Sequence, residues 1–321
     1  MSDYSVSNSS DQAKQGHADQ AKQGHHVALD VSAEEIQQHT VHVDMQCAVN
    51  NMSKGQDYAC SGEAVCETTG LPFKWAAVFD GHGGHEVINY IRSENINKHA
   101  ARPNPAESLQ AAITESNVLP PYLPTSGSTM AMVKVFSDHA DVITVGDSVI
   151  VVYEDGIPIL VTQCHDSDNA GEVERVRTTF PYVRIEDSHT ISVLSETRIT
   201  SRAKSQFLYG GGLILAPSQA LGHRNRTGIC PGKYTVVFQP GKRYRITGAS
   251  DGVFDMAILD HPSDLAILSR GLAEEVVAFY TSRWLQIWEY MKTPDAETVE
   301  QRFQYTEKQS DDVSAFTVDI V

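Results

Sequence analysis

A buried strand that ends in a glycine-rich turn is the feature that most constrains the fold of this chain. Residues 75–79 form an uninterrupted apolar run, Trp-Ala-Ala-Val-Phe, which predicts a buried strand. The run stops at Asp80-Gly81-His82-Gly83-Gly84, where the glycines lack the Cβ atoms that would keep a ligand from the backbone. Carboxylate and carbonyl oxygens are ligands for Mg²⁺ and Mn²⁺, and an imidazole can transfer a proton. The turn is therefore a candidate catalytic site, although Asp-Gly and Gly-Gly are also ordinary turn signals.

Other carboxylates stand in matching positions. Asp147 follows a predicted strand at 142–145, Asp251 follows one at 243–247, and Asp311 precedes the last predicted strand, 316–320. If that last strand runs antiparallel to the others, its start lies at the same sheet edge as their ends. Each of these acids also fits a routine turn. Four carboxylates at one edge repel one another unless cations neutralise them, so the pattern favours a metal site.

The chain divides into a polar segment and one folded domain. Residues 1–38 carry the duplication Asp-Gln-Ala-Lys-Gln-Gly-His and few apolar residues, so we expect a disordered low-complexity tail. Residues 39–321 are predicted to form one α+β domain. The expected strands are 41–43, 74–79, 129–136, 142–145, 149–153, 157–161, 234–238, 243–247 and 316–320. The expected helices are one starting near 87, 106–117, 170–177 and two between 264 and 291, broken near Gly271, while 178–212 is expected to be irregular.

Composition restricts the function classes. The chain has 41 acidic and 25 basic residues, for a net charge of −16, which disfavours nucleic acid and anionic membranes as partners. Its five cysteines have irregular spacing and form no Cys-x-x-Cys pair, which argues against a zinc site and fits a reducing compartment. We therefore expect a soluble protein of the cytoplasm or nucleus.

The motifs resemble, in order over about residues 40–321, those of the metal-dependent protein serine/threonine phosphatases of type 2C, the PPM family. The resemblance lies in the Asp80 turn, in Gly127-Ser128-Thr129 with Val145-Gly146-Asp147-Ser148, and in Thr162–Val176. It continues in Ser218–Gly222, in Ala249–Asp255 and in Ser310–Ser314. It implies a four-layer α-β-β-α sandwich of two antiparallel sheets flanked by antiparallel helices, with metals at one sheet edge.

The resemblance also implies roles. Asp80 bridges two Mn²⁺ or Mg²⁺ ions, Asp251 and Asp311 complete one ion site, and the Gly81 carbonyl helps to hold the other. Asp57 matches the family's N-terminal acidic motif, and Asp147 matches a residue associated with a third, weaker ion. A water activated between the two ions attacks the phosphorus of phosphoserine or phosphothreonine in a protein, and His82 protonates the leaving oxygen as general acid.

The chain departs from the family at four places. Gln56 stands where a metal-binding Glu is usual, which implies a weaker second metal site. No arginine precedes Asp57 at the expected distance, so Lys54 is the candidate phosphate-binding residue, as a point charge. Gln219 and His223 replace an Arg and an Asp, and Asp312 replaces an Asn. The leading hypothesis is an active phosphatase. The alternatives are a phosphatase-fold pseudoenzyme with a binding or regulatory role and another metal-dependent hydrolase.

Overall fold

The computed structural model describes residues 41–119 and 125–321, which belong to one compact unit. The interpretation of residues 1–38 as a disordered tail lies outside the described residues. The part of the chain that is described contains no helix long and apolar enough to cross a membrane.

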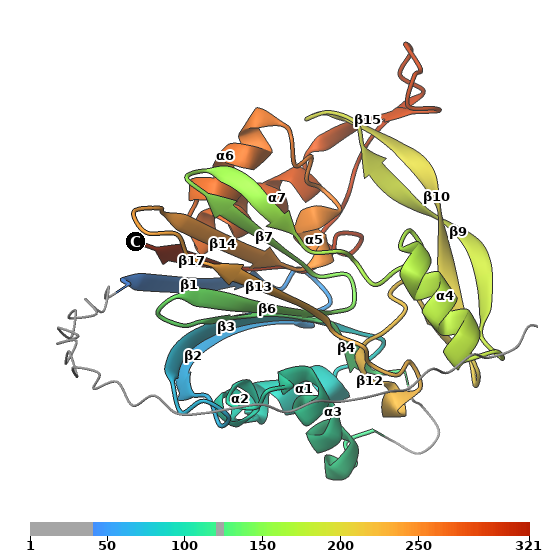
Figure 1. The fold of residues 1–321 in the computed structure, drawn as a ribbon. Helices are drawn as coiled ribbons and strands as arrows, with labels where there is room; N and C mark the ends of the chain where they lie inside the picture. Colours follow the sequence, from blue (N-terminus) through green and yellow to red (C-terminus); the bar gives the residue numbers. More distant parts are fainter. Residues whose placement is uncertain (1–40, 120–124) are drawn as a thin grey trace, which may run out of the picture. The chain divides into compact units, whose positions relative to one another are not determined.

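Two antiparallel sheets form the centre of the unit (Figure 1). The first has the strand order β1-β17-β14-β7-β8, and the second has the order β12-β4-β3-β5-β6-β13 with β2 paired to β3. The strands of the first sheet are β1 (Val43–Asn50), β7 (Val149–Glu154), β8 (Ile157–Val161), β14 (Tyr244–Ala249) and β17 (Val313–Ile320). Those of the second are β2 (Asp57–Val65), β3 (Pro72–His82), β4 (Gly127–Ser128), β5 (Met130–Val135), β6 (His139–Val145), β12 (Leu221–Gly222) and β13 (Gly232–Val237).

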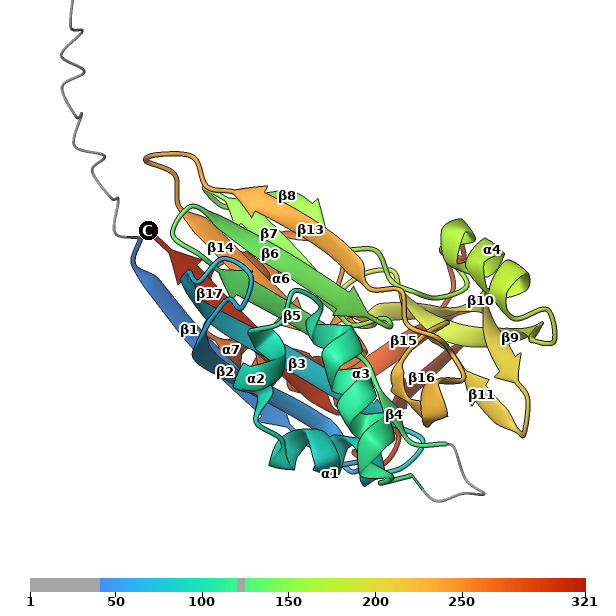
Figure 2. The same cartoon turned by 60° about the horizontal axis from the view of Figure 1, so that its bottom comes forward.

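Helices cover the outer face of each sheet, and apolar side chains fill the three spaces between the four layers. Val78, Val133 and Phe316 are among those between the sheets. Phe79 of β3 and Ile88 of α1 belong to the cluster between the second sheet and α1 (Glu86–Ser93), α2 (Ile96–Ala100) and α3 (Pro105–Ser116). Val151 of β7 and Tyr280 of α7 belong to the cluster between the first sheet and α5 (Asp251–Phe254), α6 (Pro262–Arg270) and α7 (Ala273–Trp284). The fold is thus the α-β-β-α sandwich that the sequence predicts, and Figure 2 shows it from a second side.

A third sheet lies beside the sandwich, and the sequence did not predict it. Its order is β11-β10-β15-β16, with β9 paired to β10. It contains β9 (Arg184–Val193), β10 (Arg198–Tyr209), β11 (Leu213–Leu215), β15 (Ile287–Met291) and β16 (Gln301–Gln304), and it packs on α4 (Ala170–Thr179).

This third sheet corrects two expectations. Residues 178–212 are not irregular, because β9 and β10 form a long hairpin with ten paired positions. The stretch expected to be helical to Met291 stops at Trp284, because Ile287–Met291 pairs with β10 and β16 instead. The alternation of apolar and polar residues was too weak in the hairpin to show strands. In 287–291, tertiary pairing overrides an apolar pattern that also suits a helix.

The antiparallel order brings strand ends from both halves of the sequence to one edge. β17 pairs with β14 so that Ala315 faces Ala249, which places the start of β17 beside the end of β14. β2 pairs with β3 so that Asp57 faces Asp80. This is the arrangement that the sequence predicts for the last strand, and it determines where the acidic residues lie.

Candidate metal and phosphate site

A cavity of about 530 Å³ opens at this edge of the sheets. Eight of its lining residues are candidate site residues from the sequence: Lys54, Gln56, Asp80, Gly81, His82, Asp147, Asp251 and Asp311. Gly81 is a candidate through its backbone carbonyl, and the others are candidates through their side chains. The segment 212–217, which follows the β9–β10 hairpin, forms another wall. Asp57 does not line the cavity; it lies behind it, 2% exposed, at the start of β2. The structure therefore brings every predicted site residue into or next to one cavity.

Like charges dominate the electrostatics of the cavity. Burial, followed by the charges of Asp251, Asp57 and Asp311, raises the pKa of Asp80 well above its usual value. Burial and the charge of Asp311 do the same for Asp251. Burial raises the pKa of Asp57 to about 7. Carboxyl groups in this state are stabilised by a hard cation, which turns repulsion into attraction.

Individual atoms show that the donor set fits such a cation. Within the described residues, Oδ1 of Asp251 is buried and has no hydrogen-bond partner. A Cβ added to Gly81 would lie 2.6 Å from the backbone oxygen of Gln56, so only glycine fits where the carbonyl of residue 81 is presented. At Gly83, φ is +72° and a Cβ would collide with the backbone of Thr125. The two glycines are thus required by the close approach of Gln56 and Thr125 to the turn, and Asp251 offers an unpartnered oxygen in the same cavity.

Asp311 has a different partner. The Nζ atom of Lys54 lies 2.5 Å from its Oδ1, and Asp311 is one of the charges that raise the pKa of Lys54 against the opposing effect of burial. Among the described residues, no three acidic, histidine or cysteine side chains stand close enough together to hold an ion without moving. Binding through Asp311 therefore requires the Lys54 ammonium to move away, for instance toward a phosphate.

Gln56 connects three parts of the site. Its backbone N–H donates to Oδ2 of Asp312 at 2.6 Å, and its backbone oxygen accepts the N–H of Gly81 at 3.0 Å. Its side-chain amide donates to the carbonyl of Gly84 at 2.9 Å. The residue therefore holds the glycine turn of β3 against the loop before β17, whatever ligand its amide oxygen binds.

His82 has a partner that the sequence analysis did not anticipate. Its Nε2 lies 2.9 Å from Nε2 of His223, within hydrogen-bond distance. Burial, then the His223 charge, lowers the pKa of His82 to about 3, so His82 is a neutral imidazole at neutral pH. His223, Arg224 and Asn225 all have left-handed φ angles, between 46° and 57°. This rare conformation turns the His223 ring toward Gly127, where an added Cβ would lie 2.0 Å from Nε2.

The sequence analysis also did not assign a role to Asp166, Lys204 or Asp255, whose charges act on Asp147 in the cavity wall. Lys204 comes from β10, in the stretch expected to be irregular. No sequence motif marks a lysine in a polar strand, so its position became apparent only from the pairing of the hairpin.

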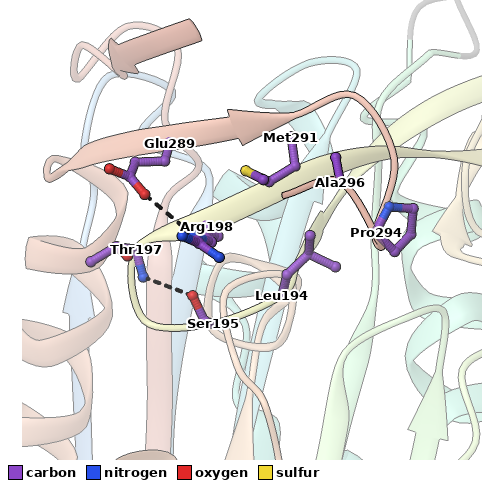
Figure 3. Close-up of a pocket in the computed structure, with 8 residues that line it drawn as sticks. All are labelled: Leu194, Ser195, Thr197, Arg198, Glu289, Met291, Pro294 and Ala296. Carbon is purple, nitrogen blue, oxygen red and sulfur yellow. Dashed lines mark hydrogen bonds and ion pairs between the residues drawn. The ribbon is translucent and has the colours of Figure 1, made fainter. Parts of the chain in front are cut away.

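A separate cavity of about 390 Å³ lies in the third sheet, between the β9–β10 turn and the loop after β15 (Figure 3). Arg198 crosses it to Glu289, with 3.4 Å between Nε and Oε2. Leu194, Met291, Pro294 and Ala296 form the apolar part of its wall. It contains one acid, already paired, and so lacks the convergent carboxylates of the first cavity.

Comparison with known proteins gives one consistent match. The sequence profile described as "Protein phosphatase 2C" matches residues 41–202. No curated protein sequence matches the chain. A C. elegans sex determining protein superposes with a TM-score of 0.52 at 16% identity, covering 87% of this chain and 64% of that one, so this chain spans less than two thirds of it.

Two microbial structures match over nearly their full length. The S. agalactiae serine/threonine phosphatase superposes with a TM-score of 0.51 at 16% identity, covering 86% of this chain and 99% of that chain. The serine-threonine phosphatase 2C from Toxoplasma gondii gives 0.50 at 14% identity, covering 86% and 99%. At such identities these likenesses concern the fold.

Proposed function

Since the chain belongs to the protein phosphatase 2C family, we propose that it is a metal-dependent protein phosphatase acting on phosphoserine and phosphothreonine. The observation that carries the proposal is the cavity in which Asp80, Asp251 and Asp311 meet beside the Gly81 carbonyl. Their buried, mutually repelling carboxylates form a donor set for hard divalent cations such as Mn²⁺ or Mg²⁺.

In this proposal two ions are held by the chain. Asp80, Asp251 and Asp311 would hold them, together with the Gly81 carbonyl, Gln56 and the buried Asp57. Bound divalent ions lower the pKa of a water molecule placed for attack and stabilise charge on the phosphoryl oxygens. Because Gln56 offers a neutral oxygen, we expect its ion to bind more weakly than the first.

The remaining residues bind phosphate and move the proton. Lys54 lines the cavity and pairs with Asp311 in the free protein, and it would pair with a phosphoryl oxygen if cations took its place on Asp311. His82 lines the same cavity and is our candidate donor to the leaving serine or threonine oxygen. A phosphate dianion beside the ring favours the protonated imidazole, which counteracts the low pKa of His82 in the free protein.

The alternative function is a phosphatase-fold binding protein without turnover. The Lys54–Asp311 ion pair favours it, because that lysine occupies one of the expected metal ligands. Gln56 in place of a carboxylate favours it too. Either way, the substrate or partner we propose is a phosphorylated protein of the cytoplasm or nucleus. The five cysteines, all described and all unpaired as thiols, are consistent with that compartment.

A Mn²⁺-titrated assay on a phosphothreonine peptide tests the proposal. We expect phosphate release that requires Mn²⁺ and stops with a chelator. Asp80→Asn and Asp251→Asn should each lower it by at least about 1,000-fold, since several kcal/mol of charge stabilisation is lost. Asp187→Asn, an exposed change on β9, is the matched control and should leave the rate unchanged.

The same samples distinguish the two functions. Binding of Mn²⁺ and phosphopeptide without turnover identifies the binding protein. Turnover that persists in chelator, or that survives Asp251→Asn, contradicts the metal-dependent mechanism.

A further inference from the structure

Lys204 is a buried cation close to Asp147, one of the residues that line the cavity. It extends from β10 with its side chain 13% exposed, and its Nζ lies 3.1 Å from Oδ2 of Asp166. Asp166 is itself 5% exposed and follows His165 in the loop before α4. A lysine without a buried partner keeps its ammonium in water, so the burial of Lys204 requires a specific electrostatic reason.

That reason is a group of three carboxylates. Burial by itself lowers the pKa of Lys204, but Asp147, Asp166 and Asp255 together outweigh burial and raise it. In return, the Lys204 charge opposes the burial that raises the pKa values of Asp147 and Asp255. Arg202, two positions earlier on β10, also acts on Asp255. The loop that carries Asp166 is fixed beside Asp147, because the backbone N–H of His165 donates to the carbonyl of Gly146 at 2.9 Å and Nδ1 of His165 accepts the N–H of Gly146 at 3.1 Å. The corner around Asp147 therefore already contains a positive charge supplied by the chain.

Neighbouring contacts hold the lysine in place. Arg202 Nη1 lies 2.6 Å from Oδ2 of Asp168, and the backbone N–H of Ser205 donates to Oγ of Ser167 at 3.0 Å. Together with the Lys204–Asp166 ion pair, these contacts hold β10 against the loop 166–168. The backbone on either side of Lys204 is thus fixed, and this limits where its ammonium can lie.

We propose that the Lys204 ammonium replaces, as a cation built into the chain, the third divalent ion that the family resemblance associates with Asp147. This inference deepens the proposed function and rests on it, because the proposed function supplies the two other ions. It predicts a protein that uses two metal ions where Lys204 is present, and that accepts a further ion at Asp147 and Asp255 only when the lysine is removed.

Counting bound ions tests the inference without any activity assay. Mn²⁺ stoichiometry is measured by equilibrium dialysis and by titration calorimetry on wild type, Lys204→Met and Lys204→Arg. We expect Lys204→Met to bind one ion more than wild type and Lys204→Arg to match wild type, because arginine retains the charge. Lys242→Met, which removes an exposed lysine paired with Asp155, is the control and should bind as wild type does.

The extra ion must depend on the acidic corner. Adding Asp147→Asn to Lys204→Met should abolish it. Thermal melting supplies the second readout: Mn²⁺ should raise the melting temperature of Lys204→Met more than that of wild type. Equal stoichiometry in wild type and Lys204→Met overturns the inference. So does a wild-type ion that Asp147→Asn removes, which is measurable even if Lys204→Met fails to fold.

The outcome for Lys204 is separate from the outcome for the proposed function. Wild type that binds no Mn²⁺ contradicts the proposed metal site, whereas the difference between Lys204→Met and wild type decides the role of the lysine. If wild type bound no ion and Lys204→Met bound one, the result would support the proposed role of Lys204 and contradict the proposed phosphatase function.

Discussion

Two buried acidic regions of this protein solve the same electrostatic problem in opposite ways. In the first turn of α6, Asp264 is fully buried and accepts hydrogen bonds from Tyr280 and from Arg283, which is itself 4% exposed. At the sheet edge, Asp80 and Asp251 lie near one another with raised pKa values and an unpartnered Oδ1 on Asp251. The first region has its counter-charge, Arg283, within the chain, even though Oδ2 of Asp264 also has no hydrogen-bond partner among the described residues. The second region suits cations from outside. Burial of an acid therefore indicates a metal site only when its counter-charge is missing from the chain.

The largest expected effect on stability comes from removing Arg283, the counter-charge of Asp264. Arg283→Met leaves Asp264 buried and unpaired by arginine, which is expected to cost about 3–5 kcal/mol of unfolding free energy. Urea unfolding in chelator measures it. Asp251→Asn is the counterpart in the other region, and because it removes repulsion it should leave stability equal to or above wild type. A loss of stability for Asp251→Asn as large as for Arg283→Met would show that the two regions are alike.

The pH dependence of stability should sharpen the comparison. Asp57 has a pKa of about 7 and Asp147 one of about 6 in the folded protein, against about 3.9 for an unfolded aspartate. The folded state therefore binds more protons between those values, and these groups make the metal-free protein less stable as the pH rises from about 4 to about 7.

This dependence is measured as melting temperature in chelator at pH 5 and pH 8. Asp57→Asn should reduce the decline toward pH 8 relative to wild type. Saturating Mn²⁺ should oppose the decline, because metal ligands bind better when deprotonated. An unchanged pH dependence in Asp57→Asn would mean that the edge carboxylates are not protonated in the folded state.

The smallest expected effect concerns His82, the candidate proton donor. His223→Asp places a carboxylate beside His82, and aspartate tolerates the left-handed φ of this position better than most residues do. The pKa of His82 should rise from about 3 by at least about one unit. Histidine NMR titration of the metal-free protein measures it. His223→Asn, which adds no charge, is the control, and equal pKa values in both variants would remove His223 as the influence on His82.

The family resemblance implied the two main sheets, whereas the convergence of the acids was predictable from the residues themselves. Strand periodicity marks where Asp80, Asp147 and Asp251 leave their strands, and antiparallel order then determines that Asp311 joins them. The roles of His223 and Lys204 depend on geometry that no periodicity encodes. His223 reaches His82 through a run of left-handed residues, and Lys204 reaches Asp166 through a hairpin whose strands alternate only weakly.

The position of β17 has a consequence for the folding of this protein during its synthesis. The strand lies between β1 and β14, so the sheet edge is completed by residues 313–320 of a 321-residue chain. Until that segment emerges, β1 and β14 lack their shared neighbour and Asp311 is missing from the cavity. Such long-range pairing is slow, so we expect the acidic edge of a nascent chain to stay incomplete until residues 313–320 have been synthesised.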